Sequence, residues 1–256
     1  MLNLTHENEF ACTKVGEQED FVHTVLTAIL QTPQYVPQDL RYDMLILSLG
    51  LLINLVEGCD VNRRKVLDAN THRSFEFDCL GNKNTVPASK ALVEVFCKRF
   101  ETAKDMEEQD FSEGPTTPQE SPNKSGEWKE SEAGMEWVIN SAKKNKDGQN
   151  GDVEDRLKPN KEEDLADEET FAKALHRAGK HMENSIVASY IALLLGCVIQ
   201  DNTMFVNQVK EHLPSGNFDD MIMILKKFLS FMNLTTAIGS SGGKSIGHVI
   251  EVLEGC

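Results

Sequence analysis

The most apolar stretch of the chain reads IVASYIALLLGCVI and spans residues 186–199. Its 14 residues are too few to cross a membrane, which takes about 20. Because apolar side chains cover almost the whole circumference of a helix here, the helix needs neighbours on several sides. A second stretch of this kind spans residues 39–57. Each contains a glycine among aliphatic residues, in LSLGLLIN at 47–54 and in LLLGCVIQ at 193–200, where a neighbouring helix could approach closely.

Around these two stretches, the spacing of apolar residues predicts further helices and no convincing strand. The further helices are expected at 21–30, 60–67, 87–100, 171–178 (ending near Gly179), 203–209, 217–232 and 246–253, with a loop at 70–84. Stacked helix pairs would give the two most apolar helices the partners they need. The sequence therefore predicts an all-α fold, a HEAT/armadillo-like helical repeat stack. The alternative is that the two glycine-centred runs resemble each other by coincidence.

Charge divides the chain into three parts. The net charge is −15, but residues 101–170 carry 21 acidic and 9 basic side chains, so that −12 lies there and −3 elsewhere. Such a polar segment buries too little surface to offset its ordering entropy. We therefore expect helical repeats at 1–108, an acidic disordered insert at 109–164 and helical repeats at 165–256, with the two helical parts forming one continuous domain. An apolar patch around Trp128 and Trp137 is the exception and could dock on the folded part.

Two Ser/Thr-Pro sites lie in the expected insert, Thr117–Pro118 and Ser121–Pro122. Phosphorylation would add about −1.5 to −2 charges at each site. One hypothesis is that both are phosphorylated by a proline-directed kinase. The alternative is an unmodified linker.

Features of targeting, metal binding and catalysis are missing from the sequence. The first ten residues do not resemble a signal peptide, and the six cysteines include no Cys-x-x-Cys pair. We therefore expect reduced thiols, no metal, no membrane association and no cofactor. The acidic balance also argues against direct nucleic-acid binding, because neutralising phosphates takes a basic surface.

A glycine-rich segment, GSSGGKS at 239–245, partly resembles a phosphate-binding loop. The consensus has four residues between the first glycine and Gly-Lys-Ser, whereas this segment has three and follows a helix. A turn between helices is the preferred interpretation, so no enzyme is predicted. A nucleotide-dependent enzyme that uses Lys244 is the weakest alternative.

Six sequence runs resemble those of a known family. The C-terminal runs are ALHRAGKHMENSIVASY at 174–190, ALLLGC at 192–197 and LKKFLSFMNLT at 225–235. LNLTH at 2–6, GLLINLVE at 50–57 and KSGEW at 124–128 match in the same order. Together they resemble the conserved C-terminal domain of the wings-apart-like proteins, the cohesin release factors.

The resemblance implies a HEAT-like, non-catalytic nuclear protein associated with chromatin. It also implies that the protein binds cohesin subunits together with a HEAT-repeat cohesin regulator, promotes cohesin release and opposes sister-chromatid cohesion. Compared with the family, the chain starts in mid-repeat and is expected to lack the earlier repeats and the N-terminal partner-binding motifs. The resemblance therefore does not predict that this chain releases cohesin unaided.

The family's cohesin-binding patch matches the stretch 181–186, and the residues carried over by this resemblance are Met182 and Ile186. Four positions apart, they share one helix face. The alternative is that both are core residues. Arg63 and Arg64 could meet an acidic partner or form a solvated face. Without the resemblance, the sequence predicts a generic HEAT/armadillo adaptor for another protein.

Overall fold

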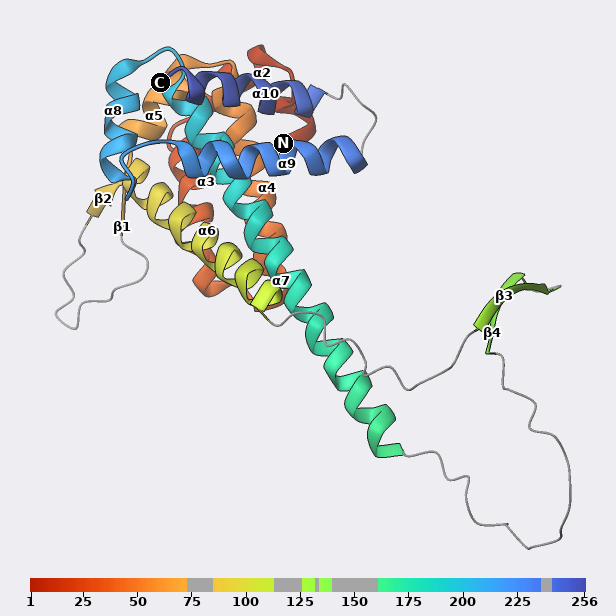
Figure 1. Cartoon of the computed structure of the whole chain (residues 1–256). Coiled ribbons are helices and arrows are strands. Elements are labelled where there is room, and N and C mark those ends of the chain that lie inside the picture. Colours follow the sequence, from red (N-terminus) through yellow and green to blue (C-terminus); the bar gives the residue numbers. More distant parts are fainter. Residues whose placement is uncertain (73–84, 113–125, 132–133, 140–160, 236–240) are drawn as a thin grey trace, which may run out of the picture. The chain divides into compact units, whose positions relative to one another are not determined.

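The computed structural model describes residues 1–72, 85–112, 126–131, 134–139, 161–235 and 241–256 (Figure 1). The chain divides into two compact units. Unit 1 combines Met1–Met106 with Arg177–Cys256, and unit 2 is Glu107–His176. The described residues are predominantly helical, which confirms the expectation of a helical fold at that level. Whether an acidic insert begins at 109 and ends at 164 stays a prediction.

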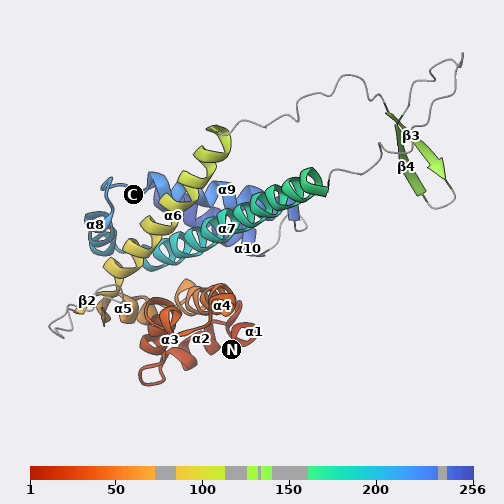
Figure 2. The same ribbon diagram turned by 90° about the horizontal axis from the view of Figure 1, so that it is seen from below.

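The helices of unit 1 fall into two layers, which Figure 2 separates. The first layer contains α1 (Leu2–Thr5), α2 (Glu9–Gly16), α3 (Phe21–Leu30), the 3-10 helix η1 (Thr32–Tyr35), α4 (Gln38–Glu57) and α5 (Asp60–Asp68). The second contains α8 (Thr203–His212), α9 (Asp219–Thr235), α10 (Ser241–Glu254) and the unit 1 parts of α6 (Ala88–Ser112) and α7 (Lys161–Ile199).

Asparagine side chains begin three of these helices. The Oδ1 atom of Asn8 accepts a hydrogen bond from the backbone N of Ala11 at the start of α2. Asn202 caps α8 in the same way, and Asn217 accepts from the backbone N of Asp219 at the start of α9. Each cap satisfies a backbone N–H that has no partner within its helix.

The core of unit 1 is continuous across both layers. Its largest fully buried side chains are Phe96, Leu26, Leu49, Leu52, Leu55, Leu92, Ile191, Leu194, Leu195, Ile199, Met221 and Leu225. The two most apolar stretches of the sequence, now in α4 and α7, supply seven of these twelve residues. The prediction of burial on nearly all sides is therefore confirmed for α7, whereas α4 leaves Leu40 and Leu47 exposed.

Two short hairpins depart from the expectation that no strand forms. In unit 1, β1 (Asn70–His72) pairs antiparallel with β2 (Thr85–Pro87). In unit 2, β3 (Gly126–Ser131) pairs antiparallel with β4 (Gly134–Ile139), with Trp128 opposite Trp137. Strands of three residues are too short to show a two-residue period, which explains why 70–72 looked like a loop. Docking of the Trp128–Trp137 patch stays a prediction, while Thr117 and Ser121 lie outside the described residues.

The helix predicted to end near Gly179 instead continues as α7 without a break. A single glycine inside a helix costs only about 1 kcal/mol relative to alanine, and the helix formers around it offset this cost. By length and composition alone, the segment Leu175–Ile199 could also cross a membrane. Most of its apolar window is buried inside the fold, as in the core helix of a globular protein.

Candidate protein-binding surface

The two residues carried over as binding residues lie on α7 in unit 1. Met182 is 52% exposed, a large value for an apolar side chain of this size. Ile186, one turn further along the same face, is half-buried. The structure therefore contradicts the alternative that both are core residues. It does not test whether they bind a partner.

Polar contacts to α6 hold this part of α7 in place. Asn184 is buried, and its Oδ1 atom accepts a hydrogen bond from the Nη1 of Arg99 at 2.8 Å. Its Nδ2 atom donates to the backbone oxygen of Lys180 at 3.0 Å. Burial lowers the pKa of Arg99, an effect that the nearby carboxylate of Glu183 opposes. The guanidinium of Arg99 on α6 is thus hydrogen-bonded to the side chain of Asn184 on α7. This contact fixes the backbone of α7 next to Met182.

Contacts to α4 and α9 fix the next two turns of α7. The ring of Tyr190 lies 5.8 Å from that of Phe228 on α9, centroid to centroid. A Cβ atom added at Gly50 of α4 would lie 3.9 Å from Cε1 of Tyr190, so α4 also passes close to this ring. Burial raises the pKa of Tyr190 and that of Tyr42 on α4, the latter also because of Tyr190 and Glu183.

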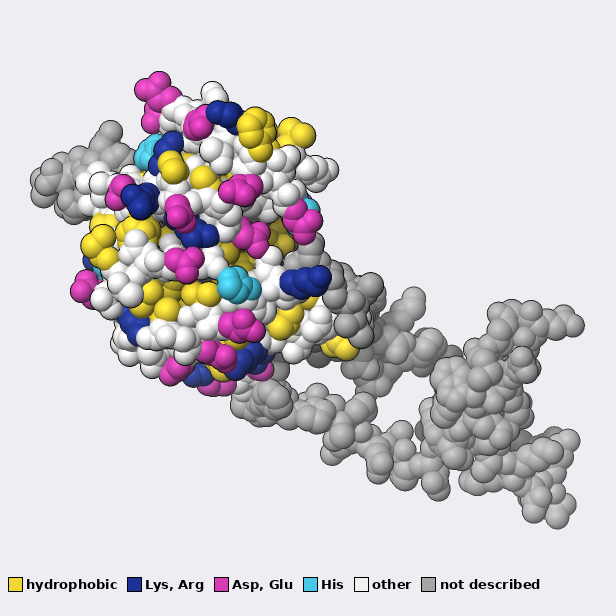
Figure 3. Space-filling view, turned by 90° about the horizontal axis from the view of Figure 1, so that it is seen from above, with side chains coloured by type: hydrophobic (Ala, Val, Ile, Leu, Met, Phe, Trp, Pro, Cys, Tyr) yellow, Lys and Arg dark blue, Asp and Glu magenta, His cyan; other side chains and the backbone are white. Residues whose placement is uncertain are grey.

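The arrangement therefore presents an apolar side chain on a helix that three neighbours hold in place. A flexible thioether in such a position can fill a pocket on a partner at little ordering cost to the backbone. Charge does not single out a partner on the face of the described residues shown in Figure 3, where acidic and basic side chains are interspersed with apolar ones.

The sequence predicted that Arg63 and Arg64 both lie on the surface. For Arg63 this prediction is wrong. Arg64 is exposed, whereas Arg63 is only 7% exposed. The guanidinium donates to the backbone oxygens of Val56 and Glu57, at 2.8 and 2.6 Å, and so caps the C-terminus of α4.

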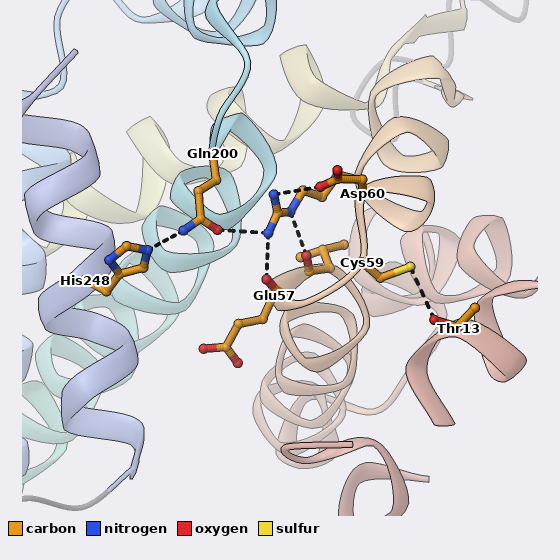
Figure 4. Close-up of polar contacts among 8 residues, drawn as sticks. Thr13, Glu57, Cys59, Asp60, Gln200 and His248 are labelled. Carbon is orange, nitrogen blue, oxygen red and sulfur yellow. Dashed lines mark hydrogen bonds and ion pairs between the residues drawn. The ribbon is translucent and has the colours of Figure 1, made fainter. Parts of the chain in front are cut away.

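Arg63 also links the two layers of unit 1, through partners that include Asp60 and Gln200, both labelled in Figure 4. Its Nη1 atom lies 3.0 Å from Oδ1 of Asp60, and its Nη2 atom donates to Oε1 of Gln200, at the end of α7, at 2.9 Å. Gln200 in turn contacts His248 of α10, and Ser245 donates to the carboxylate of Glu57. The sequence signal for this junction was slight: each glycine-centred run ends in a polar amide residue, Asn54 or Gln200.

The described residues contain no group of three or more His, Cys, Asp or Glu side chains that could hold a metal ion. Burial raises the pKa of Cys97 to about 11 and that of Cys197 to about 12. Because the thiolate is the reactive form, these two cysteines are poor nucleophiles near neutral pH. Lys244 lies in α10, and the helix already begins at Ser241, so residues 241–245 do not form a phosphate-binding loop.

Comparison with known proteins gives a consistent family. Residues 1–62 match the family described as "Wings apart-like protein regulation of heterochromatin". The whole chain is 44% identical to the human wings apart-like protein homolog, over 267 aligned residues and 21% of that protein. It is 32% identical to wings apart-like protein homolog 1 of Caenorhabditis elegans, with 99% of the chain and 33% of the relative aligned.

The protein wings apart-like of Drosophila melanogaster is 28% identical over 93% of the chain and 12% of its own length. The chain thus spans a third or less of each of these relatives. Similarity nevertheless extends from one end of the chain to the other, which agrees with the order of the six runs quoted from the sequence. The chain therefore belongs to the wings apart-like family, as a segment of its longer members.

Proposed function

We propose that this chain is a non-catalytic cohesin-binding module that promotes the release of cohesin from chromatin in the nucleus. In this role it regulates sister-chromatid cohesion and, as the family description suggests, heterochromatin. Its partners are cohesin subunits and a HEAT-repeat cohesin regulator. The observation that carries the proposal is the 44% identity to a wings apart-like protein over the whole chain.

The fold supports the HEAT-like part of the proposal through a contact that occurs twice. On α4, Gly50 faces Leu2 of α1, and the Nδ2 of Asn54 donates to the backbone oxygen of Leu2 at 3.2 Å. On α7, Gly196 faces Val249 of α10, and Gln200 contacts His248. In both cases a glycine admits a neighbouring helix, and an amide four residues later binds it. Such recurrence is what a stack of related helical units produces.

The exposed Met182 supports a binding role for α7. A large apolar side chain on the surface is a normal feature by itself, but this one lies within the stretch that resembles the family's binding patch. We propose that Met182 inserts into cohesin and that Ile186 packs at the edge of the contact.

The second candidate function is a generic helical adaptor for a different protein. The same exposed Met182 would serve it, because apolar docking does not by itself select cohesin. Affinity purification from nuclear extract separates the two functions. Recovery of another partner together with absence of cohesin would favour the adaptor.

Binding of purified cohesin to the immobilised chain tests the proposal. Met182→Glu should weaken binding by at least about 30-fold, the effect of losing a central contact of about 2 kcal/mol or more. Because Met182 is exposed, the melting temperature should stay within about 2 °C of the original chain. Met204→Glu is the matched control, since Met204 is a 68% exposed methionine on α8 and should bind normally.

Two results would contradict the proposal. The first is that the unmodified chain retains no cohesin. The second is that Met182→Glu and Met204→Glu bind equally well, which would leave cohesin binding in place but remove Met182 from the contact.

A further inference from the structure

The junction around Arg63 joins four helices at one point. Glu57 ends α4, Arg63 belongs to α5, Gln200 follows α7, and His248 lies on α10 (Figure 4). Hydrogen bonds between these side chains therefore connect the two layers of unit 1. Each bond forms only if one group donates and the other accepts.

The direction of every hydrogen bond in this chain of contacts is set by Arg63. A guanidinium can only donate, so the amide oxygen of Gln200 must face it, as its 2.9 Å distance to Nη2 shows. The amide nitrogen of Gln200 then faces the Nε2 of His248, and this nitrogen can only donate. His248 must therefore accept at Nε2, which it can do only as the neutral ring with its proton on Nδ1.

We propose that Gln200 and His248 form a proton-sensitive latch, which neutral His248 closes and protonated His248 opens, loosening α10 from Gln200. Protonation would place an N–H on Nε2, opposite an NH2 group that is also a donor. Gln200 could restore the contact only by rotating its amide, and it would then turn the NH2 group toward Arg63. The buried guanidinium would lose an acceptor, so rotation does not rescue the latch.

Charged groups of both signs lie in the elements around His248, so some favour the protonated ring and others disfavour it. Glu57 of α4 and Asp60 of α5 are negative, whereas Arg63 of α5 is positive and nearer to Gln200. On α10 itself, Lys244 and Glu251 lie one turn away on either side. Two further charged groups contact the far end of α10, where Lys226 of α9 binds Glu254 and Lys210 of α8 binds the backbone oxygen of Cys256.

Long-range ¹H–¹⁵N NMR of the histidine rings in the full chain tests the closed state directly. At pH 7.5 we expect the Nε2 of His248 to be unprotonated and its Nδ1 protonated, and we expect Gln200→Ala to remove this preference. The chain has seven histidines, so the other six are internal references. A ring protonated at Nε2 at pH 7.5 would overturn the proposal.

Melting temperatures at pH 7.5 and 5.5 test the open state. His248→Gln keeps an acceptor at both pH values. On acidification its melting temperature should therefore fall less than that of the unmodified chain, by about 1–2 °C, because His248 is exposed. Gln200→Glu can accept hydrogen bonds from both Arg63 and protonated His248. Its melting temperature should therefore also fall less on acidification. Equal falls in melting temperature for the unmodified chain and for His248→Gln would overturn the latch, because every other titrating group is common to these two proteins.

Discussion

Arg63 shows what sequence reasoning misses at the scale of a residue. Charged residues are usually solvated, and the pair Arg63–Arg64 offers no pattern that separates its members. The difference arises from tertiary structure, because only Arg63 reaches the free carbonyl oxygens at the end of α4 and the amide of Gln200. By contrast, the exposure of Met182 agrees with the binding role that the family resemblance implies. The spacing of apolar residues alone did not predict it.

The two arginines make a matched pair for measurement. Arg63→Met should lower the free energy of unfolding by about 2–4 kcal/mol, because two backbone carbonyls and Gln200 lose a buried charged donor. Arg64→Met should change it by less than about 0.5 kcal/mol, since Arg64 is exposed. Urea denaturation of the full chain gives both values. Similar effects at the two positions would contradict the buried role of Arg63.

At the scale of the element, the two glycine-centred runs were the most informative part of the sequence. They predicted close helix approach in α4 and α7, and Gly196 confirms it most clearly: an added Cβ would lie 2.2 Å from Cγ1 of Val249. Helix ends were harder to predict. Gly179 looked like a helix end, yet an added Cβ there meets nothing within 4 Å, and the helix continues through it.

Gly196 and Gly179 therefore predict opposite results for the same substitution in the same helix. Gly196→Ala should destabilise the protein by about 1–3 kcal/mol through overpacking against α10. Gly179→Ala should stabilise it by about 0.5–1 kcal/mol, because alanine has less backbone entropy to lose.

A double-mutant cycle checks the cause. Combined with Val249→Ala, Gly196→Ala should cost less than the sum of the two single substitutions, as measured by denaturant unfolding. Strict additivity would mean that Val249 is not what excludes a larger residue at 196.

At the scale of the whole molecule, the sequence predicted that the two outer parts form one continuous domain, but composition did not show which of their residues meet. The shared core depends on contacts between residues far apart in sequence. Arg63 with Gln200, Ser89 with Gln208 and Arg99 with Asn184 all join residues of Met1–Met106 to residues of Arg177–Cys256. No local pattern encodes such pairings, whereas the helices that make them were largely predictable.

Limited proteolysis of the native chain tests this organisation. The composition of 109–164 predicts that the first cuts fall there, since cleavage prefers segments with few buried apolar residues. The two resulting fragments should then elute together on size exclusion and separate only in denaturant, because they share the core of unit 1. Early cuts within α4 or the second half of α7, or fragments that separate under native conditions, would contradict the prediction.

The shared core also has a consequence during protein synthesis. Residues 1–106 cannot complete their packing until residues 177–256 have left the ribosome, because each supplies part of the other's interior. Translation at about 5–20 residues per second makes the wait on the order of ten seconds. During that interval the apolar side of α4 that later faces α7 is uncovered, so the nascent chain is a natural client for chaperones that bind exposed apolar helices.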